Sequence, residues 1–372
     1  MLKKSKFNIK KTALIIITSI LGLIIVLALF IKLDTQAAAE FTDNYLRPIF
    51  GNKNVVTLEK VFYNTSDKID QLTSQGGKSP SYTETDQIAP TGGDMDVNPI
   101  PVNAKLIPLK NEGVWLWKKL NIFPSQEVLA YTFVRPDTTR PYANVTLIQA
   151  DIGPLMLGDV AGTKQPGTPI GNPGPGMVPS NIVQNGLLVA AFNGGFQYRD
   201  GGYGMIVGNK TYLPLKNNLG TLVGYTNGSI KIVNYLGQDL GTNIAFIRQN
   251  CPILIENGIL EVSNPQNHAL WGRTDTTDIY TWRSGIGITA KGNLLYAVGN
   301  NINPTTLATA LKMGGAINAI QLDINPFWVR FSVFNYLGNG NYSSTALMNG
   351  VYNGAKQFLG GYQKDFFFLY KK

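Results

Sequence analysis

The feature that most constrains this chain is an uncharged apolar segment near its start. Residues 12–31, TALIIITSILGLIIVLALFI, form a run of twenty residues without a charge, which is long enough to cross a hydrocarbon core of about 30 Å. Five lysines precede this segment and only Lys32 follows it closely, and such a lysine excess keeps the N-terminus in the cytoplasm. We therefore expect a cytoplasmic basic tail at 1–11, a single-pass transmembrane helix at 12–31, and an extracytoplasmic remainder.

A cleaved signal peptide is the alternative that the sequence leaves open. The apolar core of such a peptide would span roughly 7–15 residues, which is shorter than the segment here. The run Ala37-Ala38-Ala39 nevertheless offers a cleavage site of the A-x-A type. The prediction is an anchored protein in the cell membrane, with secretion after cleavage near Ala39 as the alternative.

The positive charge of the chain is concentrated at its N-terminus. The whole sequence has a formal charge of +9, but six lysines and no acidic residue lie in residues 1–32, which leaves only +3 for the rest. The remainder has no basic stripe with interleaved aromatic residues of the kind that follows a phosphate backbone. We therefore expect the membrane as a partner and no nucleic acid.

The chain has one cysteine and one histidine. Cys251 cannot form an internal disulfide, and exported domains without disulfides suggest a bacterial source. Multi-ligand zinc sites need more of these two residue types than the chain has. The lone His268 likewise argues against a hydrolase built on a serine–histidine triad.

Composition divides the rest of the chain into three parts. Residues 32–72 mix apolar and polar positions and are interpreted as a juxtamembrane segment. Residues 73–103 are rich in Ser, Thr, Gly, Pro and Asp, so they bury too little apolar surface to offset chain entropy and are predicted to be a flexible linker. Residues 104–372 have the size of one large domain.

Turn signals dominate this domain and predict its fold class. Asn-Gly and Gly-Asn pairs separate β-rich runs, which is typical of hairpins; they lie at 227–228, 257–258 and 208–209. Helix is expected sparingly, and the clearest helix begins near Pro304 and ends at Gly314. The sequence predicts an α+β fold with β-rich mixed sheets and a few helices, preceded by the N-terminal transmembrane helix.

Polar residues at the ends of apolar strands are the candidates for chemistry. Asn193 is followed by two glycines in LLVAAFNGGF, and glycine lets the backbone approach a ligand closely. Arg283 lies beside a tryptophan in DIYTWRSGIGIT. Its guanidinium group can donate two parallel hydrogen bonds to a phosphate or a carboxylate. Asp323 and Asn325 follow the strand-like AINAIQL, where Asp323 is interpreted as a strand-end carboxylate or as a turn cap.

Three motifs in order resemble the phosphodiester glycosidase family, which is related to the N-acetylglucosamine-1-phosphodiester alpha-N-acetylglucosaminidase known as the uncovering enzyme. FNGGF at 192–196, WRSGIGIT at 282–289 and AIQLD at 319–323 are similar to the family's corresponding segments in order and spacing. The resemblance extends over roughly residues 140–345, and it implies that 104–372 is a phosphodiester glycosidase-like domain of a bacterial, membrane-anchored member.

The resemblance implies hydrolysis of a sugar-1-phosphodiester. It implies that Arg283 holds the phosphate, that Asn193 with Gly194 and Gly195 orients the substrate, and that Asp323 contributes acid–base chemistry or stabilises the transition state. Glycoside hydrolysis ordinarily uses two carboxyl groups, and Asp151 in LIQADIG is nominated as the second. A phosphate leaving group lowers the need for a second carboxyl group.

The sequence departs from the family after Asp323. The family's Leu-Asp-Gly-Gly-Gly-Ser is replaced by Leu-Asp-Ile-Asn-Pro-Phe-Trp at 322–328, so Pro326 removes a backbone donor that glycine would supply. Asn325 and Trp328 are kept as candidate substrate-binding residues, because an indole can stack on a sugar ring.

The resulting hypothesis is a membrane-anchored hydrolase that acts on a sugar-1-phosphodiester or a related glycosidic bond in envelope polysaccharide. The alternative is a catalytically inactive glycan-binding or structural module on the same scaffold. The expected partner besides the membrane is a carbohydrate or sugar-phosphate substrate. No cofactor is expected to be required, and a divalent cation, calcium or magnesium, is left open.

Overall fold

The computed structural model describes residues 49, 118–119, 128–140, 143–167, 173–272, 279–324, 329–346 and 355–372. The chain divides into two compact units, Met1–Thr65 and Ser66–Lys372, and every described strand belongs to the second. The predicted anchor at 12–31 and the predicted linker at 73–103 lie outside the described residues. No helix among the described residues has the length and apolar character needed to cross a membrane.

Three antiparallel sheets make up most of the described structure. The largest has eight strands in the order β1 (Lys118–Lys119), β2 (Leu129–Val134), β3 (Val145–Ala150), β14 (Leu294–Ile302), β13 (Thr281–Thr289), β15 (Ala316–Ile324), β11 (Ile253–Glu256) and β12 (Ile259–Leu260). A five-stranded sheet follows the order β7 (Lys210–Leu213), β6 (Met205–Val207), β10 (Ile244–Gln249), β8 (Leu219–Tyr225) and β9 (Ile230–Tyr235). The other five-stranded sheet follows the order β17 (Asn341–Ala346), β16 (Phe331–Gly338), β5 (Leu188–Asn193), β18 (Phe366–Lys371) and β4 (Leu155–Val160).

The β-rich α+β class is confirmed, whereas the prediction of mixed sheets is corrected. Every strand pair within the described ranges is antiparallel. Tight turns reverse the chain and therefore pair neighbouring strands antiparallel. The longer crossover from β14 through a helix to β15 also gives no parallel pair, because β13 lies between these two strands.

The predicted hairpin turns are confirmed. Gly228 connects β8 to β9 at a φ of 88°, and Gly208 connects β6 to β7 at a φ of 55°. Between β11 and β12, Asn257 and Gly258 both have positive φ, at 50° and 78°. Two consecutive positive φ values are the requirement of a type I′ turn, which is the reason that the Asn-Gly pair is informative.

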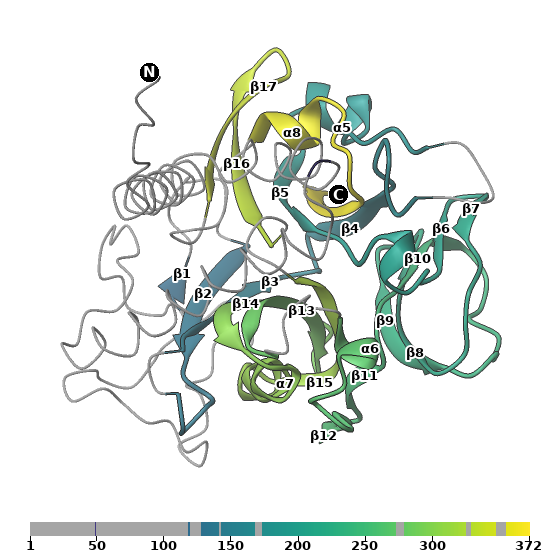
Figure 1. Ribbon diagram of the computed structural model, residues 1–372. Coiled ribbons are helices and arrows are strands. Elements are labelled where there is room, and N and C mark those ends of the chain that lie inside the picture. Colours follow the sequence, from purple (N-terminus) through teal and green to yellow (C-terminus); the bar gives the residue numbers. More distant parts are fainter. Residues whose placement is uncertain are drawn as a thin grey trace, which may run out of the picture. The chain divides into compact units, whose positions relative to one another are not determined.

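The predicted helix is also confirmed, as α7 (Pro304–Met313) with Gly314 at its C-terminal cap. Asn303 caps its N-terminus, because its side-chain oxygen accepts a hydrogen bond of 2.8 Å from the backbone N–H of Thr306. Figure 1 shows α7 against the eight-stranded sheet, where it contacts β13, β14 and β15. The remaining described helices are short: α5 (Ser180–Gln184), α6 (His268–Trp271), α8 (Ala355–Leu359) and the 3-10 turn η3 (Tyr198–Asp200).

The main hydrophobic core is shared by the three sheets. It contains Leu322 from β15, Phe246 from β10 and Phe367 from β18, all nearly inaccessible to solvent. Phe192, at the end of β5, stacks on Phe331 with ring centroids 5.3 Å apart. Burial of such large side chains supplies most of the driving force for packing the sheets together, and it fixes the position of the polar residues that follow these strands.

Candidate active site

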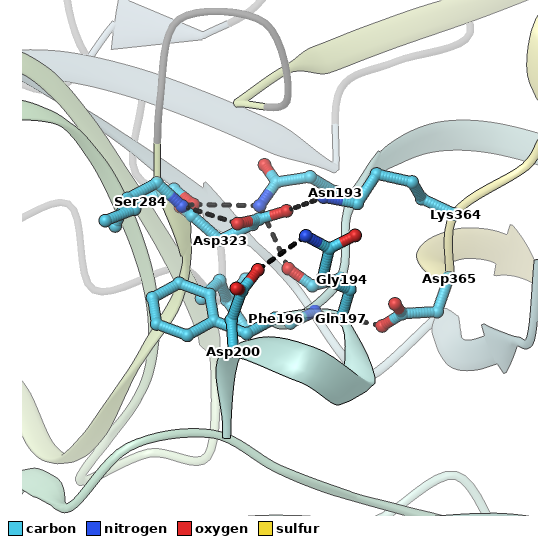
Figure 2. Close-up of polar contacts among 12 residues, drawn as sticks. Asn193, Gly194, Phe196, Gln197, Asp200, Ser284, Asp323, Lys364 and Asp365 are labelled. Carbon is cyan, nitrogen blue, oxygen red and sulfur yellow. Dashed lines mark hydrogen bonds and ion pairs between the residues drawn. The ribbon is translucent and has the colours of Figure 1, made fainter. Parts of the chain in front are cut away.

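Polar side chains converge where the ends of four strands meet. Asn193 is the last residue of β5, Asp323 is the penultimate residue of β15, Arg248 lies near the end of β10, and Lys364 and Asp365 directly precede β18. The backbone N–H of Asp323 donates to the carbonyl of Gly194 at 3.0 Å. This bond links the largest sheet to the turn that follows β5. Figure 2 shows Asn193, Gly194 and Asp323 grouped around it.

Asp323 forms a nearly buried ion pair with Lys364. One carboxylate oxygen accepts from the ammonium group of Lys364, and the other accepts from the backbone N–H of Ile324 at 2.9 Å. Both side chains retain an exposed fraction of 8%. Burial raises the pKa of Asp323 to about 6, although the ammonium group of Lys364 acts in the opposite direction. Asp323 therefore titrates close to neutrality at the edge of solvent.

Asn193 uses its whole side chain to hold this arrangement. Its amide nitrogen donates to the carbonyl of Gly194 and to the hydroxyl of Ser284, and its amide oxygen accepts from the hydroxyl of Tyr296 at 2.7 Å and from the backbone N–H of Arg330 at 3.1 Å. The Ser284 hydroxyl in turn donates to the carbonyl of Asp323 at 2.8 Å. Asn193 thus positions the end of β15, which carries Asp323. Both the amide nitrogen and the amide oxygen of Asn193 are hydrogen-bonded to protein atoms.

Gly194 and Gly195 form the turn after β5, and both lie too close to other groups to carry a side chain. A Cβ atom on Gly194 would overlap the carboxylate of Asp365, and one on Gly195 would lie 2.8 Å from the guanidinium carbon of Arg248. The close approach predicted from the sequence is therefore made to neighbouring side chains, and the Asn-Gly-Gly motif is needed for packing as well as for the turn.

Substituting Gly194 with alanine is expected to lower the free energy of unfolding by about 1–3 kcal/mol, because the added methyl group overpacks a buried ion-pair site. The urea midpoint of unfolding measures the effect. Gly314→Ala is the matched control, because Gly314 has an ordinary φ of −73° and its nearest obstacle is a leucine methyl at 3.1 Å. Equal midpoints for the two variants would contradict the packing role.

Arg248 and Asp365 form a second ion pair, which the sequence analysis did not find. Arg248 Nε donates to Asp365 Oδ2 at 2.9 Å, and neither side chain has any exposed surface. The same carboxylate oxygen accepts the backbone N–H of Gly195, while the Asp365 carbonyl accepts that of Gly194. Arg248 also donates to the carbonyl of Phe196 at 2.8 Å. This ion pair therefore fixes the backbone of the Asn-Gly-Gly turn through its hydrogen bonds to Gly194, Gly195 and Phe196.

The structure places Arg283 away from a position that could bind phosphate directly. Its guanidinium group is fully buried and donates to three backbone carbonyls, those of Trp271, Ile279 and Ile302, and to the side chain of Gln321. Burial lowers the pKa of Arg283 to about 10. Its observed role is to connect β13 to the segments around α6 and β14.

Asp151 is not brought together with Asp323. β3 runs from Val145, which pairs with Gly299, to Ala150, which pairs with Leu294, and Gly299 is the partner of Arg283 on β13. Arg283 also pairs with Ile324, the neighbour of Asp323. Asp151 follows Ala150 and therefore lies at the opposite end of the sheet, displaced by roughly 17 Å along the strand direction at about 3.3 Å per residue. Its carboxylate closes the turn before β4 by accepting the backbone N–H of Gly153 at 2.8 Å.

Two of the candidate residues cannot be placed in this arrangement. Asn325 and Trp328 lie outside the described residues. Within the described ranges, no three histidine, cysteine or acidic side chains are grouped in a way that would hold a metal ion.

The sequence signal for the missed residues was the same as for the residues that were found. Lys364 and Asp365 directly precede the apolar run FFFLY, and Arg248 follows the apolar run AFI. Polar residues therefore also stand at the ends of β18 and β10. Neither segment, however, contains a motif that would mark these residues as part of a site.

Comparison with known proteins covers the part of the chain that carries Asn193, Arg248 and Asp323, whereas Lys364 and Asp365 lie beyond it. Residues 186–323 match the family model described as phosphodiester glycosidase. This segment belongs to the phosphodiester glycosidase family. The match begins just before β5 and ends at Asp323, so it contains the three motifs that suggested the family and confirms that resemblance. It supports a hydrolase of phosphodiester-linked sugars in general.

The solved structures that match this chain do so at low sequence identity. The catalytic domain of the zebrafish N-acetylglucosamine-1-phosphodiester alpha-N-acetylglucosaminidase, auto-inhibited by its pro-peptide, is 12% identical over 68% of this chain and 86% of that chain, with a TM-score of 0.39. A hypothetical protein from Synechocystis is 10% identical over 70% of this chain and 64% of that chain, with a TM-score of 0.37. No curated protein matches the sequence.

Proposed function

We propose that this chain is a membrane-anchored, extracytoplasmic hydrolase that cleaves a sugar-1-phosphodiester in envelope polysaccharide. The observation that carries the proposal is the ion pair of Asp323 and Lys364, which reaches solvent at the end of the segment that matches the family. A carboxylate that titrates near neutrality and a cation beside it are the two groups that such a reaction needs from the protein.

The ionised carboxylate of Asp323 acts as the general base. It accepts a proton from the water molecule whose oxygen forms a bond to the anomeric carbon, while the bond between that carbon and the phosphodiester oxygen breaks. The products are the free sugar and a phosphomonoester, which leaves as an anion and needs no proton from a second carboxyl group. The ammonium group of Lys364 stabilises the negative charge on the phosphate. Asn193, Ser284 and Arg248 position these groups through the contacts described above.

The test is hydrolysis by the full-length chain of three matched compounds: a sugar-1-phosphodiester, the same sugar linked to an uncharged alcohol, and a phosphodiester without a sugar. We expect release of free sugar from the first alone. The assay is run with added calcium, with added magnesium and with a chelator, which decides the open question of a divalent cation. Binding of the first compound without turnover under all three conditions would favour the inactive glycan-binding module.

The contribution of Lys364 is tested in the same assay. Lys364→Met is expected to lower kcat/KM for the sugar-1-phosphodiester by about 10²-fold, since it removes one charge-assisted contact to the phosphate. Lys312→Met is the matched control, because Lys312 is an exposed lysine in the last turn of α7. The same loss of activity in both variants would show that the charge acts non-specifically.

The proposed location has its own test. Fractionation of cells that express the full-length chain is expected to place it in the membrane, with the domain accessible to protease added outside. Recovery of a form that begins after Ala39 in the medium would establish secretion after cleavage instead.

A further inference from the structure

Two acidic side chains beside the proposed active site contain buried oxygens with no hydrogen-bond partner. Within the described residues, these atoms are both carboxylate oxygens of Asp159 and Oδ1 of Asp365. Asp159 has an exposed fraction of 5% and Asp365 of 1%. Buried polar atoms are almost always hydrogen-bonded, because an unsatisfied one costs about 1–3 kcal/mol. Three such atoms in one place require an explanation.

The strand register places the two carboxyl groups on the same side of their sheet. On the adjacent strands β4 and β18, Asp159 pairs with Phe367, and Val160 pairs with Phe366. Asp365 directly precedes β18, and its carbonyl continues the pairing with β5 by accepting the backbone N–H of Gly194. It is two residues from Phe367, and side chains two residues apart in extended backbone point to the same face. Asp159 and Asp365 are therefore diagonal neighbours, a separation that side chains can bridge.

The charges around this pair do not balance if both acids are ionised. Arg248, on β10, donates to Asp365 Oδ2 and supplies one positive charge. Asp323 is also close enough to Asp365 to interact with its charge, but it is already paired with Lys364. Two carboxylates with one guanidinium group in a buried site leave one uncompensated negative charge, which is strongly unfavourable.

We propose that Asp159 is protonated in the folded protein and donates its O–H to the vacant oxygen of Asp365, so that the two acids hold one proton between them. This single hydrogen bond uses the unpartnered Oδ1 of Asp365 and one oxygen of Asp159. Asp365 is then held from two sides, by Arg248 through Oδ2 and by Asp159 through Oδ1. Asp159 is a positioning residue in this arrangement.

The proton acts on the site through the Asn-Gly-Gly turn. Asp365 accepts the backbone N–H groups of Gly194 and Gly195, and the carbonyl of Gly194 accepts the backbone N–H of Asp323. Figure 2 shows Asp365, Gly194 and Asp323 in this order across the site. The effect of Asp159 on turnover rests on the proposed function, whereas its protonation does not.

The electrostatic surroundings agree with the geometry. Burial raises the pKa of Asp159 well above its ordinary value, the negative charge of Asp365 raises it further, and Arg248 and the backbone of Val160 act in the opposite direction. An acid whose pKa is raised on folding contributes most to stability below its unfolded pKa, near 4, and loses that contribution as the pH rises towards its folded pKa. Ionisation of Asp159 in the unfolded chain therefore weakens the fold at neutral pH.

The decisive experiment is infrared spectroscopy of the full-length chain at pH 8, where exposed acids and Asp323 are ionised. We expect a band from a protonated carboxylic acid that disappears in Asp159→Asn. Because asparagine donates a hydrogen bond without carrying a charge, this variant is expected to unfold at a higher urea concentration than the wild type at pH 8. Its midpoint should also vary less between pH 5 and pH 8.

A second variant separates the hydrogen bond from the charge. Asp159→Leu removes both, and we expect it to lower the turnover of the sugar-1-phosphodiester, with activity recovered in Asp159→Asn. Absence of the acid band from the wild type at pH 8 would overturn the proposal, as would a calcium-dependent rise in the urea midpoint that Asp159→Asn abolishes. If the wild type has no turnover on any substrate, the infrared band and the pH dependence of the midpoint still decide the protonation state.

Discussion

Replacing Arg248 with methionine will lower the free energy of unfolding by about 3–5 kcal/mol, the usual cost of removing one partner from a buried ion pair. The substitution leaves the Asp365 carboxylate without its counterion and with no exposed surface. It also removes the donors to the carbonyls of Phe196 and Gln249. Urea unfolding of the two proteins at pH 7 measures the difference.

The matched control for this prediction is Arg199→Met. Arg199 lies in η3, its side chain is 65% exposed and its nearest acidic group is 4.0 Å away, so its loss should change the stability by less than about 0.5 kcal/mol. Equal losses of stability in Arg199→Met and Arg248→Met would contradict the stabilising role of the buried ion pair.

Replacing Asp323 with asparagine will lower kcat/KM for the sugar-1-phosphodiester by about 10²–10⁴-fold, the range associated with loss of a general base. The asparagine can still accept the backbone N–H of Ile324, but Lys364 loses its counterion, so the urea midpoint of the variant is measured alongside its activity to show that the assayed protein is folded. Since the pKa of Asp323 is raised to about 6 and the base must be ionised, the activity of the wild type should rise with pH through this value. A rate that falls as pH increases through 6 would assign Asp323 the role of an acid instead.

Asp151→Asn is the comparison that distinguishes the structure from the sequence hypothesis. It makes the same chemical change at the acid that the sequence nominated as the second carboxyl group. Because the register of β3 places Asp151 at the other end of the sheet, this variant should retain the activity of the wild type. Equal losses in Asp151→Asn and Asp323→Asn would contradict the single-carboxylate mechanism.

Local signals in the sequence predicted much of the fold. The Asn-Gly and Gly-Asn pairs marked hairpins because positive φ is a requirement that few residues meet. Pro304 and Gly314 marked the ends of α7, because their backbone preferences act within a single turn of helix. Such signals need no knowledge of which strands become neighbours. The assumption of mixed sheets failed because strand neighbours are decided by the packing of the whole domain.

The site was only partly predictable for the same reason. Asp323 could be found because it ends a strand and belongs to a motif. Its partner Lys364 is 41 residues away in the sequence, and Arg248 is 117 residues from Asp365. A sequence pattern within one segment cannot predict ion pairs between residues that are so far apart in the chain. Arg283 was interpreted as a phosphate ligand from its neighbouring tryptophan, but three of its partners are main-chain carbonyls, which any sequence supplies, and the fourth is the side chain of Gln321.

The position of β18 has a consequence for the order in which the proposed site is assembled during synthesis. β18 lies between β5 and β4, and Lys364 and Asp365 precede it. A ribosome has therefore synthesised Asn193, Arg248 and Asp323 before it reaches either of these residues. Before Asp365 is synthesised, Arg248 has no counterion from this pair. Before β18 is synthesised, β5 and β4 lack the strand that lies between them. Addition of β18 joins β5 to β4 and supplies Lys364 and Asp365 to the two ion pairs, so the proposed site is assembled only after β18 has been synthesised.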